Sequence, residues 1–132
     1  MENKHDILVI DDEPQLVELI KNILEFENYT VRFAYNGVEG LEQVQKQIPS
    51  LIILDIMMPE MDGYEFTERL KADESYKDIP IVMLTAKGKT SDMQKGYLSG
   101  VEGYISKPFN SYDLLGVIKI ILNQKDKQAE EE

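Results

Sequence analysis

The chain has 132 residues and a mass of 15.2 kDa, the size of one ordinary domain. It contains no cysteine, which excludes disulfides, thiolate zinc sites, iron–sulfur clusters and cysteine nucleophiles. Twenty-five acidic residues against 14 basic ones give a net charge of −11, which argues against binding to nucleic acid or to an anionic membrane. No apolar run approaches the roughly 18 residues of a membrane-spanning helix, and no apolar signal segment follows the N-terminus, so we expect a cytoplasmic location.

The chain begins with a pattern typical of a buried strand followed by a helix. Ile7–Ile10 is a continuous run of β-branched and leucine residues, which predicts a strand buried on both faces. The run ends at the acidic stretch 11–13, followed by Pro14. An acidic side chain can cap a helix and proline suits its first turn, so we expect a helix to start here, with Asp12 as a possible cap. Apolar residues at three- and four-residue intervals extend it to about Phe26.

The same alternation continues to the end of the chain. In order, the sequence predicts a strand at 30–34, a helix opened by Asn36-Gly37 and broken by Pro49-Ser50, a strand at 51–54, a helix at 64–72, a strand at 79–84, a helix at 89–98, a strand at 103–106 and a helix at 111–123. The helix opened by Asn36-Gly37 is expected to bury the stripe Val38, Leu41, Val44 and Ile48. The polar residues from Gln124 on are expected to fray.

Strict alternation of strands and helices predicts an α/β protein with a parallel sheet covered by helices on both faces. In such sheets, binding sites lie beyond the carboxyl ends of the strands. The residues at those ends are all polar: Asp11, Asp12, Asp55, Thr85 and Lys107. Alone, each has an ordinary structural explanation, such as a cap, a turn or a surface lysine. Their gathering at one edge favours a functional site.

The electrostatics of this edge predict a bound cation or a retained proton. Two carboxylates about 5 Å apart repel by roughly 3 kcal/mol at an effective dielectric of about 20. Lys107 alone cannot neutralise three of them. An all-oxygen donor set without cysteine suits a hard ion, and a shallow site that leaves positions to water suits Mg²⁺ over Ca²⁺. A partly hydrated Mg²⁺ beside a carboxylate suggests phosphoryl chemistry.

The spacing of these motifs resembles the receiver domain of two-component response regulators. The motifs are Asp11-Asp12, Asp55 followed by Met57-Met58-Pro59 and Asp62-Gly63, Thr85-Ala86, and Lys107-Pro108-Phe109. The resemblance runs from about Ile7 to Leu122. It implies a flavodoxin-like (βα)5 doubly wound fold with five parallel strands in the order 2-1-3-4-5, as in the stand-alone, chemotaxis-regulator-like members. It also implies a cis Lys107-Pro108 bond.

The resemblance implies a role for each site residue. Asp55 would be the phosphoacceptor, taking a phosphoryl group from the phosphohistidine of a sensor histidine kinase or a histidine phosphotransfer protein. Asp12 and Asp55 would bind Mg²⁺ through carboxylate oxygens and Met57 through its backbone carbonyl, while Asp11 would act mainly through coordinated water. Lys107 would pair with Asp55 and then with a phosphoryl oxygen. Such a chain catalyses only its own phosphorylation and dephosphorylation, and is not an enzyme with a separate substrate.

Phosphoryl-transfer chemistry agrees with these roles. A metaphosphate-like transition state needs positioning and cations more than covalent chemistry. The Thr85 hydroxyl and backbone amides near Met57 and Ala86 could complete the phosphate cradle. Phosphorylation should draw Thr85 inward, and Tyr104 stands where the family often has an aromatic that moves into the vacated space. The surface that changes would comprise the fourth helix, fifth strand and fifth helix, and would bind a downstream protein target.

Three other interpretations stay open. A haloacid-dehalogenase-type phosphatase also uses an aspartate nucleophile with Mg²⁺, but its general acid lies two residues beyond the nucleophile, where this chain has Met57. A flavodoxin-like electron carrier would need a phosphate loop rich in Ser, Thr and Gly after the first strand, where this chain has three acids. A receiver-like module that binds partners without being phosphorylated is the third.

The resemblance also sets expectations for the domain and its ends. Residues 1–123 are expected to form the receiver domain and residues 124–132 a charged tail. The chain would be either a stand-alone receiver or a fragment of a longer regulator cut at a linker. His5, the single histidine, is expected to be an exposed terminal residue outside the phosphorelay chemistry.

Overall fold

A computed structural model describes residues 5–86 and 100–131 of the chain. Within them five parallel strands form one sheet in the order β2-β1-β3-β4-β5, which confirms the expected topology. The strands are β1 (Asp6–Ile10), β2 (Thr30–Ala34), β3 (Leu51–Asp55), β4 (Ile81–Ala86) and β5 (Gly103–Lys107). The helices of the described residues are α1 (Pro14–Phe26), α2 (Gly37–Lys46), α3 (Gly63–Lys71) and α5 (Ser111–Glu131). The helix expected at 89–98 lies outside the described residues.

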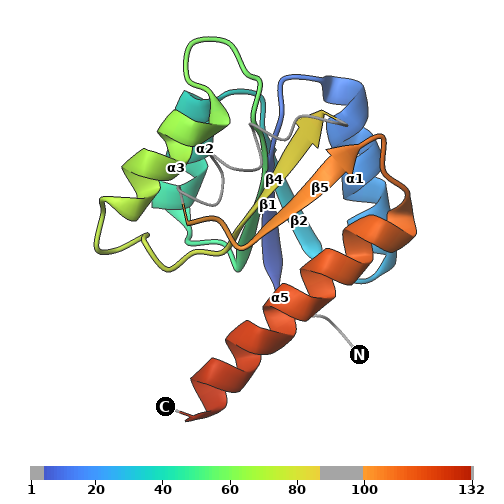
Figure 1. Cartoon of the computed structure of the whole chain (residues 1–132), viewed down its shortest axis with the longest axis vertical. Coiled ribbons are helices and arrows are strands. Elements are labelled where there is room, and N and C mark those ends of the chain that lie inside the picture. The colour runs from blue at the N-terminus through green and yellow to red at the C-terminus, as the bar shows by residue number, and fades with distance from the viewer. Residues whose placement is uncertain (1–4, 87–99, 132) are drawn as a thin grey trace.

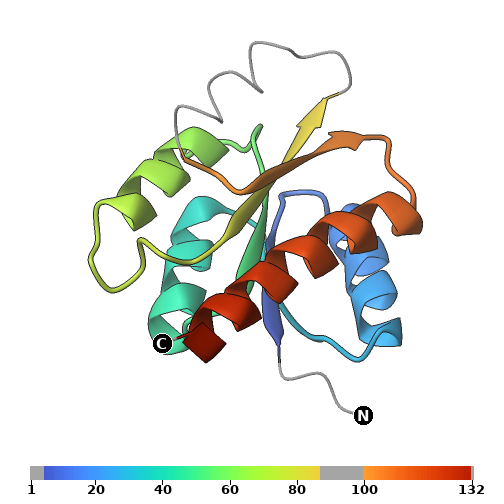
Figure 2. The same ribbon diagram turned by 60° about the horizontal axis from the view of Figure 1, so that its bottom comes forward.

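Helices cover both faces of the sheet, as the sequence predicted. Figures 1 and 2 show α1 and α5 on one face and α2 and α3 on the other. Alternate residues of β1 divide between the two cores: Ile7 and Val9 pack with α1 and α5, and Leu8 and Ile10 pack with α2 and α3. Because the central strands are buried on both sides, they need the continuous apolar runs seen in the sequence.

The helices differ in two details from the sequence-based expectation. Helix α2 ends at Lys46, before Ile48, and its buried residues are Gly37, Gly40 and the predicted Val44. Val38 and Ile48 are instead 52% and 53% exposed. A side chain at Gly40 would lie 2.6 Å from Ile10 Cδ1, so the helix approaches the sheet through its glycines. The proposed cap of α1 is also wrong. The N-cap is Glu13, and its side chain makes no capping hydrogen bond.

Strand β4 begins at Ile81, two residues later than predicted. The two residues before it belong to the connecting loop, where the Ile79 amide donates to the Tyr76 carbonyl oxygen. Pro80 has no amide hydrogen and so cannot donate a hydrogen bond to the sheet. At the next residue, the Ile81 amide donates to the side chain of Glu102.

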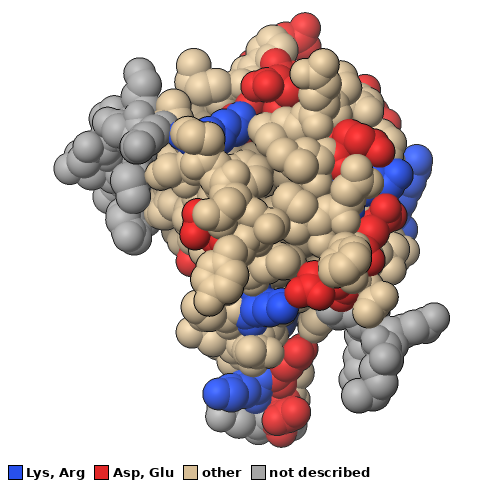
Figure 3. Space-filling model, turned by 90° about the vertical axis from the view of Figure 1, so that its right-hand side faces the viewer, with Lys and Arg blue, Asp and Glu red and all other residues tan. Residues whose placement is uncertain are grey.

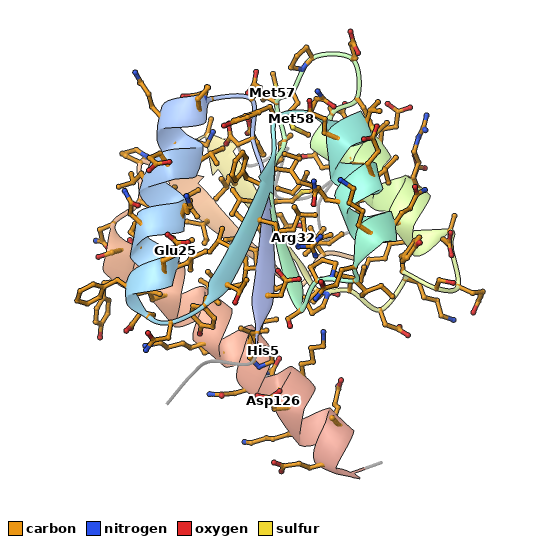
Figure 4. All side chains as sticks on the ribbon, turned by 180° about the vertical axis from the view of Figure 1, so that it is seen from behind. His5, Glu25, Arg32, Met57, Met58 and Asp126 are labelled. Carbon is orange, nitrogen blue, oxygen red and sulfur yellow. The ribbon has the colours of Figure 1, made fainter. Side chains whose placement is uncertain are left out.

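The last helix is longer than the sequence predicted. We expected α5 to end at Asn123 and the following residues to fray, but it continues to Glu131 and projects beyond the sheet (Figure 1). Two neighbouring residues of this extension are tied to the protein body. Lys125 Nζ donates to the Ser50 carbonyl oxygen at 3.0 Å, and Asp126 Oδ2 lies 3.2 Å from His5 Nε2 (Figure 4).

The expectation that His5 is an exposed terminal residue was also wrong. Its side chain is 17% exposed, and its Nδ1 lies 3.0 Å from the Ser50 hydroxyl. Tertiary contacts thus order a segment whose composition alone suggests a solvated end. No helix in the described ranges is long and apolar enough to cross a membrane.

One glycine fixes the loop between β3 and α3. A Cβ at Gly63 would lie 2.8 Å from the Asp55 carbonyl oxygen and 2.9 Å from Ile56 Cα, both backbone atoms. The Gly63 amide donates to the Ile56 carbonyl oxygen at 2.9 Å, and Asp62 caps α3 by accepting from the Glu65 amide. The start of α3 therefore lies directly against the end of β3.

Replacing Gly63 with alanine should lower the free energy of unfolding by about 1–3 kcal/mol. The added Cβ would clash with backbone atoms of Asp55 and Ile56, which cannot move away as a flexible side chain could. Gly116, on α5, has no atom within 4 Å of its Cβ position. The control Gly116→Ala should raise stability by about 0.5–1 kcal/mol. Urea denaturation of both variants measures this. Equal stabilities of the two would contradict the close approach at Gly63.

Candidate functional site

The carboxyl ends of four adjacent strands form the candidate site. In the sheet, β1 pairs with β3, β3 with β4 and β4 with β5, so their ends lie side by side. Asp11 follows β1, Asp55 ends β3 and Lys107 ends β5. The structure thus brings together polar residues that are far apart in the sequence, as the strand pattern predicted.

Three carboxylates form the acidic part of the site. Asp11 is fully buried and Asp55 is 4% exposed, whereas Asp12 is open to solvent. One oxygen of each lies within 4.8 Å of the others, a spacing at which a single cation could contact all three. An all-oxygen donor set that is buried on one side and open to water on the other suits a hard, partly hydrated ion such as Mg²⁺.

Lys107 reaches into this cluster from β5. Its Nζ lies 3.4 Å from Asp55 Oδ1 and 3.5 Å from Asp11 Oδ2. A third carboxylate, Glu13, lies 3.9 Å from the same nitrogen. The lysine side chain is 26% exposed, so part of this interaction is screened by solvent. The Lys107 ammonium group thus forms ion pairs with two buried carboxylates, Asp11 and Asp55, and with the exposed carboxylate of Glu13.

The balance of charge leaves the buried carboxylates poorly compensated. Burial and the neighbouring Asp11 carboxylate raise the pKa of Asp55 to about 6, although Lys107 and the Met57 amide oppose the shift. Burial also raises the pKa of Asp11, against the amide of Glu13 and the charge of Lys107. For Lys107, burial favours the neutral amine, but Asp55, Asp11 and Glu13 outweigh it and raise its pKa. The site therefore favours an additional positive charge.

The loop after β3 holds one face of the site. The Met57 amide donates to Asp55 Oδ1 at 3.3 Å, while the Met57 side chain is 72% exposed. Met58 and Met61 are buried against the α2–α3 side of the sheet and anchor the loop. Figure 4 shows Met57 and Met58 at the top of the molecule, at the end of the sheet opposite His5 and Asp126.

The remaining predicted residues lie on β4 and β5. Thr85 is 2% exposed, one residue beyond Leu84, which pairs with Asp55 across the sheet. Ala86, the last residue of β4, is exposed. Tyr104 is partly buried and packs against the core on the α2–α3 side. The Lys107–Pro108 peptide bond is cis, as expected.

Sequence reasoning missed one participant, Glu13. The sequence pattern assigns Glu13 only to the start of a helix, yet its carboxylate pairs with Lys107. The signal was present, because Glu13 directly follows the two aspartates at the end of the first strand. Only the path of the chain into α1 shows that its side chain turns back toward Lys107.

Comparisons with known proteins agree with this geometry. The chain matches the family model of the response regulator receiver domain over residues 7–119. It is 38% identical over 121 residues to the DNA-binding dual master transcriptional regulator RpaA of Synechocystis sp., covering 92% of this chain and 50% of that protein. It is 39% identical over 127 residues to hybrid signal transduction histidine kinase D of Dictyostelium discoideum, covering 96% of this chain and 8% of that protein.

Solved structures show the same fold. A putative response regulator from Chloroflexus aurantiacus superposes with a TM-score of 0.88 at 35% identity, covering 92% of this chain and 99% of that one. The chemotaxis protein CheY4 of Vibrio cholerae gives 0.85 at 32% identity, covering 90% and 99%. The chain spans about half the length of several of the curated regulators it matches. The strand order, the acidic cluster and these matches together show that the chain belongs to the response regulator receiver domain family of two-component systems.

Proposed function

We propose that the chain receives a phosphoryl group on Asp55 from a phosphohistidine of a sensor histidine kinase or a histidine phosphotransfer protein. The observation that carries the proposal is the Lys107 ammonium, 3.4 Å from Asp55 and 3.5 Å from Asp11, beside a cluster of carboxylates that could hold a cation. The family match over residues 7–119 supports it, and also supports a receiver unit within residues 1–123.

In the proposed reaction, an Asp55 carboxylate oxygen attacks phosphorus. The phosphorus–oxygen bond to Asp55 forms as the phosphorus–nitrogen bond to the donor imidazole breaks. Lys107, already paired with Asp55, holds an equatorial phosphoryl oxygen as charge develops there. The Thr85 hydroxyl and the backbone amides of Met57 and Ala86 supply further donors.

The donor set fits Mg²⁺, with Asp11, Asp12, Asp55 and the Met57 backbone as the proposed holders of the ion. When bound, Mg²⁺ supplies the positive charge that lets an anionic phosphoryl group approach an anionic carboxylate. The raised pKa of Asp55 supports this assignment, because burial and the neighbouring Asp11 carboxylate both make the ionised form costly when no cation is bound.

One observation argues against a hydrolase with a separate substrate. The residue two positions beyond Asp55 is Met57, whose thioether cannot transfer a proton. A phosphatase of the haloacid-dehalogenase type needs a general acid there. The proposed product is therefore the phosphorylated chain itself, which would act through a changed surface on β5, α5 and the segment expected to form the fourth helix.

Phosphorylation can be tested with Mg²⁺ and a small acyl phosphate. We expect a mass gain of one phosphoryl group that hydroxylamine removes, because acyl phosphates are sensitive to this nucleophile. Asp55→Asn and chelation of the metal should each abolish the gain, and the control Asp78→Asn, at the opposite end of the sheet, should retain it. Full labelling of the Asn variant would show that Asp55 is not the acceptor.

The electrostatic cost of the site predicts an unusual pH dependence of stability. Because the pKa of folded Asp55 lies above its unfolded value of 3.8, this group destabilises the fold increasingly as pH rises from about 4 to about 6, and its full cost remains above that. The cost is on the order of 3 kcal/mol or less. Without divalent ions at neutral pH, Asp55→Asn should therefore raise the free energy of unfolding by about 1–3 kcal/mol.

Urea denaturation at several pH values, with and without Mg²⁺, measures this effect. Mg²⁺ should stabilise the wild type much more than Asp55→Asn, because a ligand that binds the native state raises its stability. The control Asp78→Asn makes the same charge change on an exposed residue and should leave stability nearly unchanged. A destabilised Asp55→Asn variant would contradict the proposed repulsion.

The proposed switch can be followed with a beryllium fluoride mimic of the phosphoryl group. Backbone amide shifts should change at Thr85 and Tyr104 in the wild type, because the Thr85 hydroxyl would be drawn toward the mimic. Thr85→Ala should weaken the change at Tyr104 while leaving the change at Asp55. A spectrum in which Tyr104 responds equally in both proteins would rule out Thr85 as the link.

A further inference from the structure

Met57 is the only exposed methionine among the residues that the structure describes. It is 72% exposed, whereas Met58 and Met61 are 7% and 6% exposed and Met83 is fully buried. A thioether on the surface is open to oxidants in solution, while burial in the core protects the other three from them. Among these four residues, oxidation should therefore be selective for Met57.

Met57 is also held next to the proposed phosphoacceptor. Its amide donates to Asp55 Oδ1 at 3.3 Å. The loop that carries it is anchored by Met61, which packs so closely against α2 that a Cβ at Gly37 would lie 2.6 Å from the Met61 sulfur. The close approach of Gly63 to the Asp55 carbonyl fixes the other end of the loop. A chemical change at residue 57 thus stays beside the site.

Acidic side chains surround this end of the molecule. Glu60 and Asp62, on the same loop as Met57, are exposed, and so are Asp12 and Glu13 after β1. Figure 4 shows Met57 at the top of the molecule, and Figure 3, turned about the same vertical axis, shows acidic side chains at the top. A negative potential repels anions, so an uncharged oxidant reaches Met57 more readily than an anionic one.

We propose that Met57 is an oxidation site for uncharged hydroperoxides and that its sulfoxide slows phosphoryl transfer to Asp55. The thioether sulfur attacks one peroxide oxygen, the sulfur–oxygen bond forms and the oxygen–oxygen bond breaks. The other oxygen leaves with the electron pair, takes the proton and departs as water or an alcohol. Sulfur is oxidised by two electrons and the peroxide is reduced by two.

The effect on phosphoryl transfer rests on the proposed function of Asp55. Oxidation turns an apolar side chain into a polar one whose oxygen carries partial negative charge. The site already holds three carboxylates within 4.8 Å of one another, with Lys107 shared between two of them. The phosphoryl donor is itself an anion, so added negative charge at the entrance disfavours its approach.

Selective oxidation is tested on the full chain with limiting hydrogen peroxide and without divalent ions. Peptide mass spectrometry measures the rate at which each methionine gains one oxygen atom. Met57 should react severalfold faster than Met58, Met61 and Met83. In concentrated urea the four rates should become similar, because exposure in the folded state sets the difference. Equal rates in the folded protein would overturn the proposal.

The effect on phosphoryl transfer is tested with Mg²⁺ and acetyl phosphate. Protein fully oxidised at Met57 should be phosphorylated severalfold more slowly than untreated protein, and reductases for the two sulfoxide epimers should restore the rate. In the control Met57→Leu, whatever its own basal rate, peroxide should leave the rate unchanged. That control also accounts for methionines outside the described residues. An undiminished rate in the oxidised wild type, or an equal loss in treated Met57→Leu, would contradict the proposed effect.

The two measurements separate this proposal from the assignment of Asp55. If untreated protein gained no phosphoryl group, the proposed function would fail, and with it the effect of oxidation on phosphoryl transfer. The selective oxidation of Met57 would still be measured, because it needs neither Mg²⁺ nor a phosphoryl donor. Normal phosphorylation of untreated protein with slow oxidation of Met57 would overturn only the oxidation site.

Discussion

The burial of two carboxylates, Asp11 and Asp55, beside one another is the constraint on which the site depends. Each is removed from water at the end of an apolar strand, which raises its pKa, and the Asp11 carboxylate raises the pKa of Asp55 further. Lys107 offsets part of this cost but is shared between them. A folded protein that keeps such an arrangement can bind a cation favourably, because the added positive charge offsets a cost already present in the folded state.

The fold makes this arrangement possible by giving each charged group a fixed position. Parallel strands place their carboxyl ends at one edge, so residues 44 and 52 positions apart in sequence become neighbours there. Gly63 brings the start of α3 against the Asp55 carbonyl, and the buried Met58 and Met61 hold the intervening loop. The apolar cores on both faces of the sheet stabilise strands that end in groups unfavourable to bury.

Local sequence patterns predicted the strands, the parallel sheet and the residues at its edge, because continuous apolar runs and the polar residues that end them are visible in the sequence. The same patterns gave wrong predictions where contacts between distant segments determine which helix face is buried or where a helix ends. Helix α2 buries Gly40 rather than Val38 because Ile10 fills the space beneath it. Helix α5 continues past Asn123 because His5 and Ser50 hold Lys125 and Asp126. No pattern within residues 124–131 contains that information.

The most direct test of the central claim is the titration of the Asp55 carboxyl carbon by NMR, with and without Mg²⁺. We predict a pKa of about 6 without the ion and a much lower value with it, because added positive charge offsets the cost of ionising a buried carboxylate beside Asp11. A pKa near the ordinary value of about 4 that does not respond to Mg²⁺ would contradict the account.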